Sequence, residues 1–235
     1  MPNTWFRFKQ FTVHHDRCAM KVGTDAVLLG AWADIEEANR IVDAGCGSGI
    51  IALMTAQRKS GALVTGIELD ADAAKQASEN CAASAFNQRI RILNADVLGY
   101  EKDVFDHVVC NPPFHAGHVI PVNEQRKNAR HASTGLDAWF RMAYCLSNET
   151  GKASFVLPFE SFESLKTKVA HSAWHVSRYC RVIPREGKEP VRMLIELSKE
   201  EGQLKESEVQ IETTLRGHYH ESYVDLVKDF YLFID

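Results

Sequence analysis

The feature that most constrains the fold is a glycine-rich stretch between a strand-like and a helix-like segment. The sequence of residues 43–49 is Asp-Ala-Gly-Cys-Gly-Ser-Gly. It overlaps the short apolar run Arg40–Asp43, which has the pattern of a buried strand, and precedes Ile50–Lys59, which has the pattern of a helix ended by Gly61. Glycines at alternate positions let a chain turn sharply and leave backbone N–H groups open to a ligand. The stretch therefore predicts a ligand-binding turn at the edge of an α/β sheet.

From position 40 onward, strand-like and helix-like segments alternate. The expected strands are Arg40–Asp43, Leu63–Glu68, Ile90–Ala95, Phe105–Cys110, Ala153–Leu157, Trp174–Ile183 and Val191–Leu197. The expected helices are Ile50–Lys59, Ala71–Ala83, Leu136–Leu146 and Phe159–Ala170. Such alternation predicts a Rossmann-like α/β fold, in which a mostly parallel sheet has helices on both faces. The last two strands, joined by a short turn, would add an antiparallel edge.

The chain is expected to form a single domain with two flanks. Residues 40–198 would be the Rossmann-like core, 1–39 an N-terminal extension, and 199–235 a C-terminal strand and tail docked on the core. The tail has a strand-like segment, Val209–Leu215, followed by apolar residues at helical spacing: Tyr223, Leu226, Val227 and Phe230. We expect it to dock on the core, because these side chains would otherwise face water.

Composition narrows the class of protein further. The 235 residues are 45% hydrophobic and 25% charged, as in ordinary globular domains, and no stretch approaches the roughly 20 apolar residues of a membrane span. The N-terminus lacks an apolar signal core. The six cysteines lie far apart with no CxxC pair, which argues against a zinc site and for reduced thiols. We expect a cytoplasmic monomer without a metal.

The spacing of the glycines favours one cofactor over another. A dinucleotide loop would place its third glycine at position 50, where this chain has Ile50. Here Asp43 leads into Gly45, Gly47 and Gly49, which resembles the S-adenosylmethionine (SAM) loop of a Rossmann-like methyltransferase. SAM carries a cationic ammonium and a sulfonium instead of a pyrophosphate, so a carboxylate at the mouth of the loop suits it. We therefore expect SAM, with S-adenosylhomocysteine as the product.

Two further carboxylates follow predicted strands. Glu68 ends the second strand, where an acid can accept hydrogen bonds from both ribose hydroxyls. Asp96 follows the third strand, placed to accept the exocyclic amine of the cofactor's adenine. The alternative is that each acid caps a helix. Asp70 or Asp72 could cap the next helix, which leaves Glu68 or Asp70 as the ribose ligand.

The fourth predicted strand runs into Asn111-Pro112-Pro113-Phe114. A conjugated amine is a poor nucleophile, because its lone pair is delocalised into the ring. The Asn111 side-chain oxygen and the Pro112 carbonyl can accept the two amine hydrogens and aim the lone pair at a methyl group. The prolines fix the backbone, so these acceptors are preorganised, and Phe114 offers a face for a flipped base. The alternative is a turn stiffened by proline.

Positive charge is localised, although the net charge is −4. One cluster, containing Arg126, Lys127 and Arg130, follows the Asn-Pro-Pro-Phe tetrapeptide. Another lies within Lys166–Arg192, which has seven basic and two acidic residues, Arg181 and Arg185 among the basic ones. Such clusters suit a phosphate-tracking face. The alternative is a solvated basic surface.

With these residues together, the chain resembles the SAM-dependent amino-methyltransferases. More narrowly, it resembles a bacterial family that N6-methylates the adenosine just 3′ of the anticodon, position 37, in a valine tRNA. The matching segments are 11–13, 16–25, 28–32, 43–49, 111–114 and 229–232. The resemblance implies a tRNA substrate, and roles for Lys21, Thr24 and Asp25 in closing the cofactor pocket. From the residues alone, Thr24 or Asp25 is only a candidate N-cap for the helix Ala26–Ala33.

Three rival functions remain open at this point. A protein-glutamine methyltransferase acting on release factors uses the same tetrapeptide, usually with tyrosine, but normally has a helical domain that the 39 residues ahead of the core are too few to form. A DNA adenine or cytosine methyltransferase normally needs a larger recognition domain. A binding module without catalysis is the non-enzyme alternative, and the intact tetrapeptide argues against it.

Overall fold

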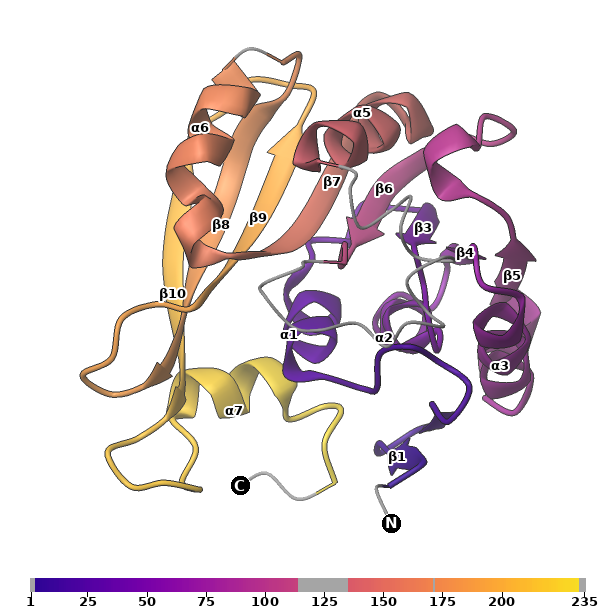
Figure 1. The fold of residues 1–235 in the computed structure, drawn as a ribbon, viewed down its shortest axis with the longest axis horizontal. Helices are drawn as coiled ribbons and strands as arrows, with labels where there is room; N and C mark the ends of the chain where they lie inside the picture. The colour runs from indigo at the N-terminus through magenta and orange to yellow at the C-terminus, as the bar shows by residue number, and fades with distance from the viewer. Residues whose placement is uncertain (1–2, 114–134, 171, 233–235) are drawn as a thin grey trace, which may run out of the picture.

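The computed structural model describes residues 3–113, 135–170 and 172–232 (Figure 1). Four of the residues predicted from the sequence to bind substrate lie outside these ranges, namely Phe114, Arg126, Lys127 and Arg130. No helix in the described ranges is both long and apolar enough to span a membrane.

The centre of the molecule is an eight-stranded sheet in the order β10-β8-β9-β7-β6-β3-β4-β5. Its strands are β3 (Arg40–Ala44), β4 (Leu63–Glu68), β5 (Ile90–Asn94), β6 (Phe105–Cys110), β7 (Ser147–Pro158), β8 (His175–Arg185), β9 (Arg192–Ser198) and β10 (Lys205–Glu212). Every pairing is parallel except those of β9, which runs antiparallel to β7 and β8. The mostly parallel sheet with antiparallel pairing is confirmed. β9 lies inside the sheet, because β8 and β10 continue beyond it.

Helices cover both faces of this sheet, as predicted (Figure 1). They are α1 (Thr24–Trp32), α2 (Ile50–Arg58), α3 (Ala71–Ala82), α5 (Leu136–Leu146), α6 (Phe162–Ala170) and α7 (Glu221–Val227). One apolar cluster joins α1, α2 and α7 to one face of the sheet, and a second joins α5 and α6 to the other. Two separate clusters form because each strand points alternate side chains to opposite faces.

The two flanks meet on the face covered by α1 and α2. The N-terminal residues form a hairpin of β1 (Trp5–Arg7) and β2 (Thr12–His14). The Lys9 N–H donates to the Phe230 carbonyl at 2.8 Å, and the Phe8 ring stacks on Tyr231 with 5.8 Å between centroids. Tyr223, Val227 and Phe230 are buried. The tail therefore packs on the core through apolar side chains at helical spacing.

Several boundaries differ from the sequence-based expectation. β10 begins at Lys205 instead of Val209, so four residues expected in a charged loop belong to a strand. These residues, Lys205–Glu208, are exposed at the edge of the sheet, where charged side chains discourage pairing with another chain. The predicted N-cap of α1 was wrong: Gly23 is the capping residue and no side chain caps the helix. Thr24 is its first residue, and Asp25 lies in its first turn.

Candidate active site

The glycine loop and the Asn-Pro-Pro segment begin side by side at the carboxyl edge of the sheet. β3 and β6 are parallel neighbours, and Ala44 pairs with Cys110 in their register. Gly45 and Asn111 are the next residues of the two strands, so they leave the sheet at the same height. In open α/β sheets, ligands bind outside the carboxyl ends of the strands. The structure thus brings together two motifs that are more than sixty residues apart in the sequence.

The loop requires its three glycines. Gly45, Gly47 and Gly49 all have positive φ angles, of 74°, 52° and 80°. A side chain there would be strained, because L-residues rarely adopt this conformation. A Cβ on Gly49 would also lie 3.3 Å from the Cβ of Ala77 on α3. The loop is further held by the Gly45 N–H, which donates to the Ile67 carbonyl on β4 at 2.9 Å.

Asp43 lies beneath the loop and not at its mouth, where we had expected it. Its side chain is buried, and Oδ2 accepts a hydrogen bond of 3.0 Å from the Ala52 N–H in the first turn of α2. Oδ1 is also buried and has no hydrogen-bond partner among the described residues. Burial and, less strongly, the nearby Glu68 charge raise the pKa of Asp43 to about 7, against the lowering effect of the Ala52 hydrogen bond. An unsatisfied buried acceptor directly below the loop fits a site completed by a cationic ligand.

Glu68 closes the loop from the neighbouring strand. One carboxylate oxygen accepts the Gly47 N–H at 2.8 Å, and the other accepts the Asp70 N–H at 2.9 Å. Asp70 is the N-cap of α3, because its side chain accepts from the N–H groups of Asp72 and Ala73. Asp70 therefore serves the helix and Glu68 the loop, and the choice between them as the ribose acceptor stays a prediction. Each oxygen of Glu68 keeps a lone pair for a hydroxyl.

Asp96 lies just beyond the end of β5, the outermost strand on this side. It is exposed, and it caps the short 3-10 turn Val97–Gly99 by accepting from the Leu98 N–H at 3.0 Å. Its role as acceptor for the adenine amine of the cofactor stays a prediction. The structure places the residue at the predicted edge and gives it a capping role besides.

The Asn-Pro-Pro segment continues from a fully buried strand end. Val108, Val109 and Cys110 have no exposed surface, whereas Asn111 is half-buried and Pro112 is buried. The Asn111 side chain therefore stands at the boundary between the core and the edge. A rigid strand on one side and two prolines on the other restrict the backbone at this position.

Lys21, Thr24 and Asp25 occupy different surroundings. Lys21 and Thr24 are exposed. The Asp25 carboxylate pairs with the Arg192 guanidinium at 2.9 Å, so it ties the first turn of α1 to the first residue of β9. A role for Asp25 in closing the cofactor pocket thus remains a prediction, and the contact that the structure shows is with the antiparallel strand.

Two residues of α3 hold the N-terminal extension against the loop, and we had not predicted them. Asn80 donates to the carbonyls of His14 (2.8 Å) and Ser48 (2.9 Å) and accepts from the His14 N–H. Gln76 accepts from the Arg17 N–H at 3.0 Å. Both amides are buried. The sequence signal that could have revealed these two residues is a pair of polar residues, four positions apart, beside the apolar face of a predicted helix.

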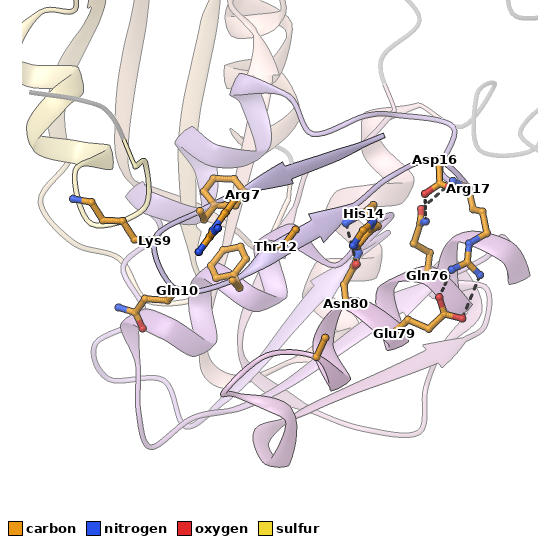
Figure 2. Close-up of a pocket in the computed structure, with 13 residues that line it drawn as sticks. Arg7, Lys9, Gln10, Thr12, His14, Asp16, Arg17, Gln76, Glu79 and Asn80 are labelled. Atoms are coloured by element: carbon orange, nitrogen blue, oxygen red, sulfur yellow. Dashed lines mark hydrogen bonds and ion pairs between the residues drawn. The ribbon is translucent and has the colours of Figure 1, made fainter. Parts of the chain in front are cut away.

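A groove of about 710 Å³ lies between the hairpin and α3 (Figure 2). Its lining is mostly polar, and residues 45–49 of the glycine loop do not contribute to it. Asn80 separates the two, because it contacts the groove on one side and Ser48 on the other. The groove is thus distinct from the carboxyl edge where the predicted cofactor residues gather.

Three arginines of the predicted basic stretch lie on β8 and are paired with carboxylates within the sheet. Arg185 pairs with Glu212 of β10 at 3.1 Å, and Arg181 lies 4.0 Å from Glu208 of the same strand. Arg178 pairs with the buried Glu196 of β9 at 3.2 Å. These carboxylates come from neighbouring strands, so the charge of the segment alone overstates the charge of the surface. An RNA contact by Arg181 or Arg185 would require exchange of a carboxylate for a phosphate.

The fold, with a glycine loop at the carboxyl edge of this strand order, defines a class I methyltransferase. A predicted O-methyltransferase from Agrobacterium tumefaciens has a TM-score of 0.67 and 24% identity over 88% of this chain and 96% of that protein, which supports the fold. Residues 19–148 match the methyltransferase small domain family.

Relatives in sequence cover nearly the whole chain. The tRNA1(Val) (adenine(37)-N6)-methyltransferase of Haemophilus influenzae is 39% identical over 97% of this chain and 98% of its own length. The enzyme of the same name from Parabacteroides distasonis is 42% identical over 99% of both chains. This chain therefore belongs to the methyltransferase small domain family, in the group that these enzymes form.

Proposed function

We propose that this chain transfers a methyl group from SAM to the exocyclic N6 amine of an adenine in tRNA. The observation that carries the proposal is the shared register of β3 and β6, which places Asn111 beside the start of the glycine loop. An amine held at Asn111 therefore lies next to whatever the loop binds. The relatives' names extend the proposal to adenosine 37 of tRNA1(Val). We expect the protein in the cytoplasm, because its proposed tRNA substrate is found there.

The residues at the edge fit SAM. Most N–H groups of the loop, among them that of Gly47, donate within the protein. No atom lies within 4 Å of the place where a side chain on Gly47 would begin, so a ligand has room to approach the loop there. Below it, the Asp43 carboxylate is a buried acceptor with one oxygen unsatisfied, which favours a cationic ligand above. Glu68 ends β4 and Asp96 follows the end of the adjacent strand β5, where they can accept hydrogen bonds from ribose hydroxyls and from an adenine amine.

The chemistry asked of the protein is positioning more than acid–base catalysis. SAM supplies an electrophilic methyl group on a sulfonium. The Asn111 side-chain oxygen and the Pro112 carbonyl accept the two N6 hydrogens, which draws the nitrogen toward tetrahedral geometry and directs its lone pair. The rigid strand end and the prolines keep these acceptors in place before the substrate arrives. A strong general base is unnecessary, because the nitrogen becomes acidic only after methylation.

The RNA contacts are a separate part of the proposal. Arg126, Lys127 and Arg130 follow the catalytic segment closely in sequence and lie outside the described residues. Arg181 and Arg185 lie on β8 in ion pairs. Phosphates could compete for these two guanidiniums, since both are more than a third exposed. We expect them to contribute less to RNA binding than unpaired cations would.

Nucleoside mass spectrometry of tRNA from a strain lacking the gene tests the function. We expect N6-methyladenosine to disappear from one isoacceptor and to return when the purified protein and SAM are added to that tRNA. Methylation of a release-factor glutamine or of DNA, with tRNA unchanged, would instead support one of the rival functions. Titration calorimetry tests the cofactor, and tighter binding of NAD than of SAM would exclude the proposed chemistry.

A further inference from the structure

One aromatic side chain beside the Asn-Pro-Pro segment has no part in the chemistry above. In the parallel register of β6 and β7, Cys110 pairs with Phe155. Continuing that register places Pro113 opposite Pro158, the last residue of β7. Phe159 comes next, so it lies at the carboxyl edge on the side of Asn111 away from the glycine loop. Because neighbouring strands are about 4.8 Å apart, the end of β7 with Phe159 forms the wall of the site next to Asn111.

The backbone and ring of Phe159 are held from two directions. Its N–H donates to the Val191 carbonyl at 3.2 Å, which anchors it to the residue before β9. Its ring stacks on Phe162 of α6, with centroids 5.9 Å apart and planes 18° apart. Phe162 in turn packs edge-on against Tyr179 of β8, with 5.1 Å between centroids. The ring is therefore a fixed platform on the sheet.

Phe159 is also only half-buried, although the aromatic residue of the strand before it, Phe155, is completely buried. A large apolar ring left partly open at a ligand-binding edge loses some of the stabilisation that burial would give it. Aromatic faces in such positions serve as stacking surfaces for bases, because every base has a planar π-face. The alternative is that Phe159 only packs the turn that connects β7 to α6.

We propose that the target adenine stacks on the Phe159 ring and extends the Phe159–Phe162 pair into a stack of three. This assignment rests on the proposed function, and it makes Phe159 a substrate-positioning residue for that reaction. With the base against this wall, its N6 amine faces the acceptors at Asn111 and Pro112 one strand away. The stack would hold the base through its face while the acceptors hold it through its edge.

The test removes the ring and the base separately. Phe159→Leu and Phe159→Met keep an apolar side chain without an aromatic face, and Phe159→Tyr keeps the ring. Each variant is measured for KM, kcat and binding with an anticodon stem-loop that has either the target adenosine or an abasic site at that position. Two variants are used so that a folding defect in one, detected by thermal unfolding, leaves the other to decide.

We expect Phe159→Leu and Phe159→Met to weaken binding of the intact RNA by about 5- to 150-fold. They should raise KM more than they lower kcat, and leave binding of the abasic RNA unchanged. Phe159→Tyr should behave as the natural protein. Tyr144→Leu is the matched control, because Tyr144 is 37% exposed and also packs on another ring, Trp174, but lies near the end of α5 close to the opposite edge of the sheet. It should change neither measurement.

Equal weakening of the intact and the abasic RNA, or no weakening of either, would overturn the assignment of Phe159 while leaving the proposed function in place. Absence of methylation of any tRNA by the natural protein would overturn the proposed function itself, and the assignment with it. A methylation assay of the natural protein therefore tells the two failures apart.

Discussion

The two halves of the sheet treat their charged residues differently. In the half formed by β3, β4 and β5, Asp43 is buried with one carboxylate oxygen unpaired, and the loop above it adopts left-handed backbone. In the half formed by β8, β9 and β10, Arg178 and Arg185 are paired with carboxylates of neighbouring strands. The first half has a buried carboxylate oxygen without a hydrogen-bond partner among the described residues, whereas in the second half these arginines are paired with carboxylates of the sheet. We infer that the first is built to receive a ligand and the second to hold the fold together.

The difference also shows how charge along a sequence can mislead. The stretch Lys166–Arg192 is strongly basic by count, yet its four arginines pair with carboxylates of β9, β10 and α1. In the register of β8 and β10, Arg181 lies opposite Glu208 and Arg185 opposite Glu212, and opposite charges on paired strands stabilise each other. A surface charge therefore has to be counted over the sheet and not along one strand.

The largest effect should come from the segment between the halves. Asn111→Ala should lower kcat by at least about 100- to 1,000-fold, because it removes a preorganised acceptor that acts in the transition state. SAM affinity and thermal stability should change little. Steady-state kinetics with tRNA, together with calorimetry, would show this. Full activity in the variant would refute the mechanism.

Breaking an ion pair in the half formed by β8, β9 and β10 should lower the free energy of unfolding and leave cofactor binding unchanged. Glu196→Ala leaves Arg178 without its buried partner, and we expect a loss of about 3–5 kcal/mol in the free energy of unfolding. Urea denaturation measures it. Glu163→Ala is the control, because its pair with Lys166 is on the surface and its side chain is 82% exposed. Similar losses in both variants would contradict the comparison.

Replacement of Asp43 should increase, instead of decrease, the free energy of unfolding of the ligand-free protein. Its pKa is raised by burial to about 7, so between pH 4 and 7 the folded state binds a proton that the unfolded state has released. Stability should therefore fall as the pH rises through this window. Asp43→Asn should remove that fall and be the more stable protein at pH 8, by up to about 4 kcal/mol, with no difference near pH 4.

The measurement is urea denaturation of both proteins across this pH range, with calorimetry of SAM binding at pH 8. We expect the substitution to weaken SAM binding, since the carboxylate would no longer face the cationic ligand. An identical pH dependence of the unfolding free energy in the two proteins would show that folding does not raise the pKa of Asp43.

A smaller effect is expected at the ribose position. Glu68→Ala should weaken SAM binding by about 1–3 kcal/mol, because it removes a charged acceptor for hydroxyl groups. Asp70→Ala should instead destabilise α3 by about 1 kcal/mol, as loss of an N-cap does, and leave SAM affinity nearly unchanged. If calorimetry shows the reverse pattern, Asp70 is the ribose ligand.

The smallest effect should come from the paired arginines. Each lost phosphate contact lowers the salt slope of RNA binding by about 0.7–0.9. We expect Arg126→Gln/Arg130→Gln to approach this value per residue and Arg181→Gln/Arg185→Gln to fall well below it, since carboxylates already neutralise the second pair. Binding of tRNA as a function of salt would decide. Equal slopes for the two double variants would mean that the ion pairs open when RNA binds.

Most of the framework could be predicted from the sequence because it depends on local rules. The strands and helices from Arg40 to Leu146 lie within one or two residues of their expected positions. Beyond them, β7 starts at Ser147, six residues before the expected start at Ala153. Periodicity and turn residues encode such elements locally. The start of β10 was missed because three of its first four residues are charged, and only the pairing with β8 makes them a strand.

The sequence by itself determined the glycine loop and the Asn-Pro-Pro segment. The freedom of Gly45, Gly47 and Gly49 to adopt positive φ angles, and the fixed φ angles of the two prolines, are properties of single residues. The tertiary structure alone decided that Asp43 is buried, that Asp25 contacts Arg192, and that Arg185 is neutralised by Glu212. These outcomes depend on strand order and register, because burial and Coulomb attraction act through space between residues that the sequence keeps far apart.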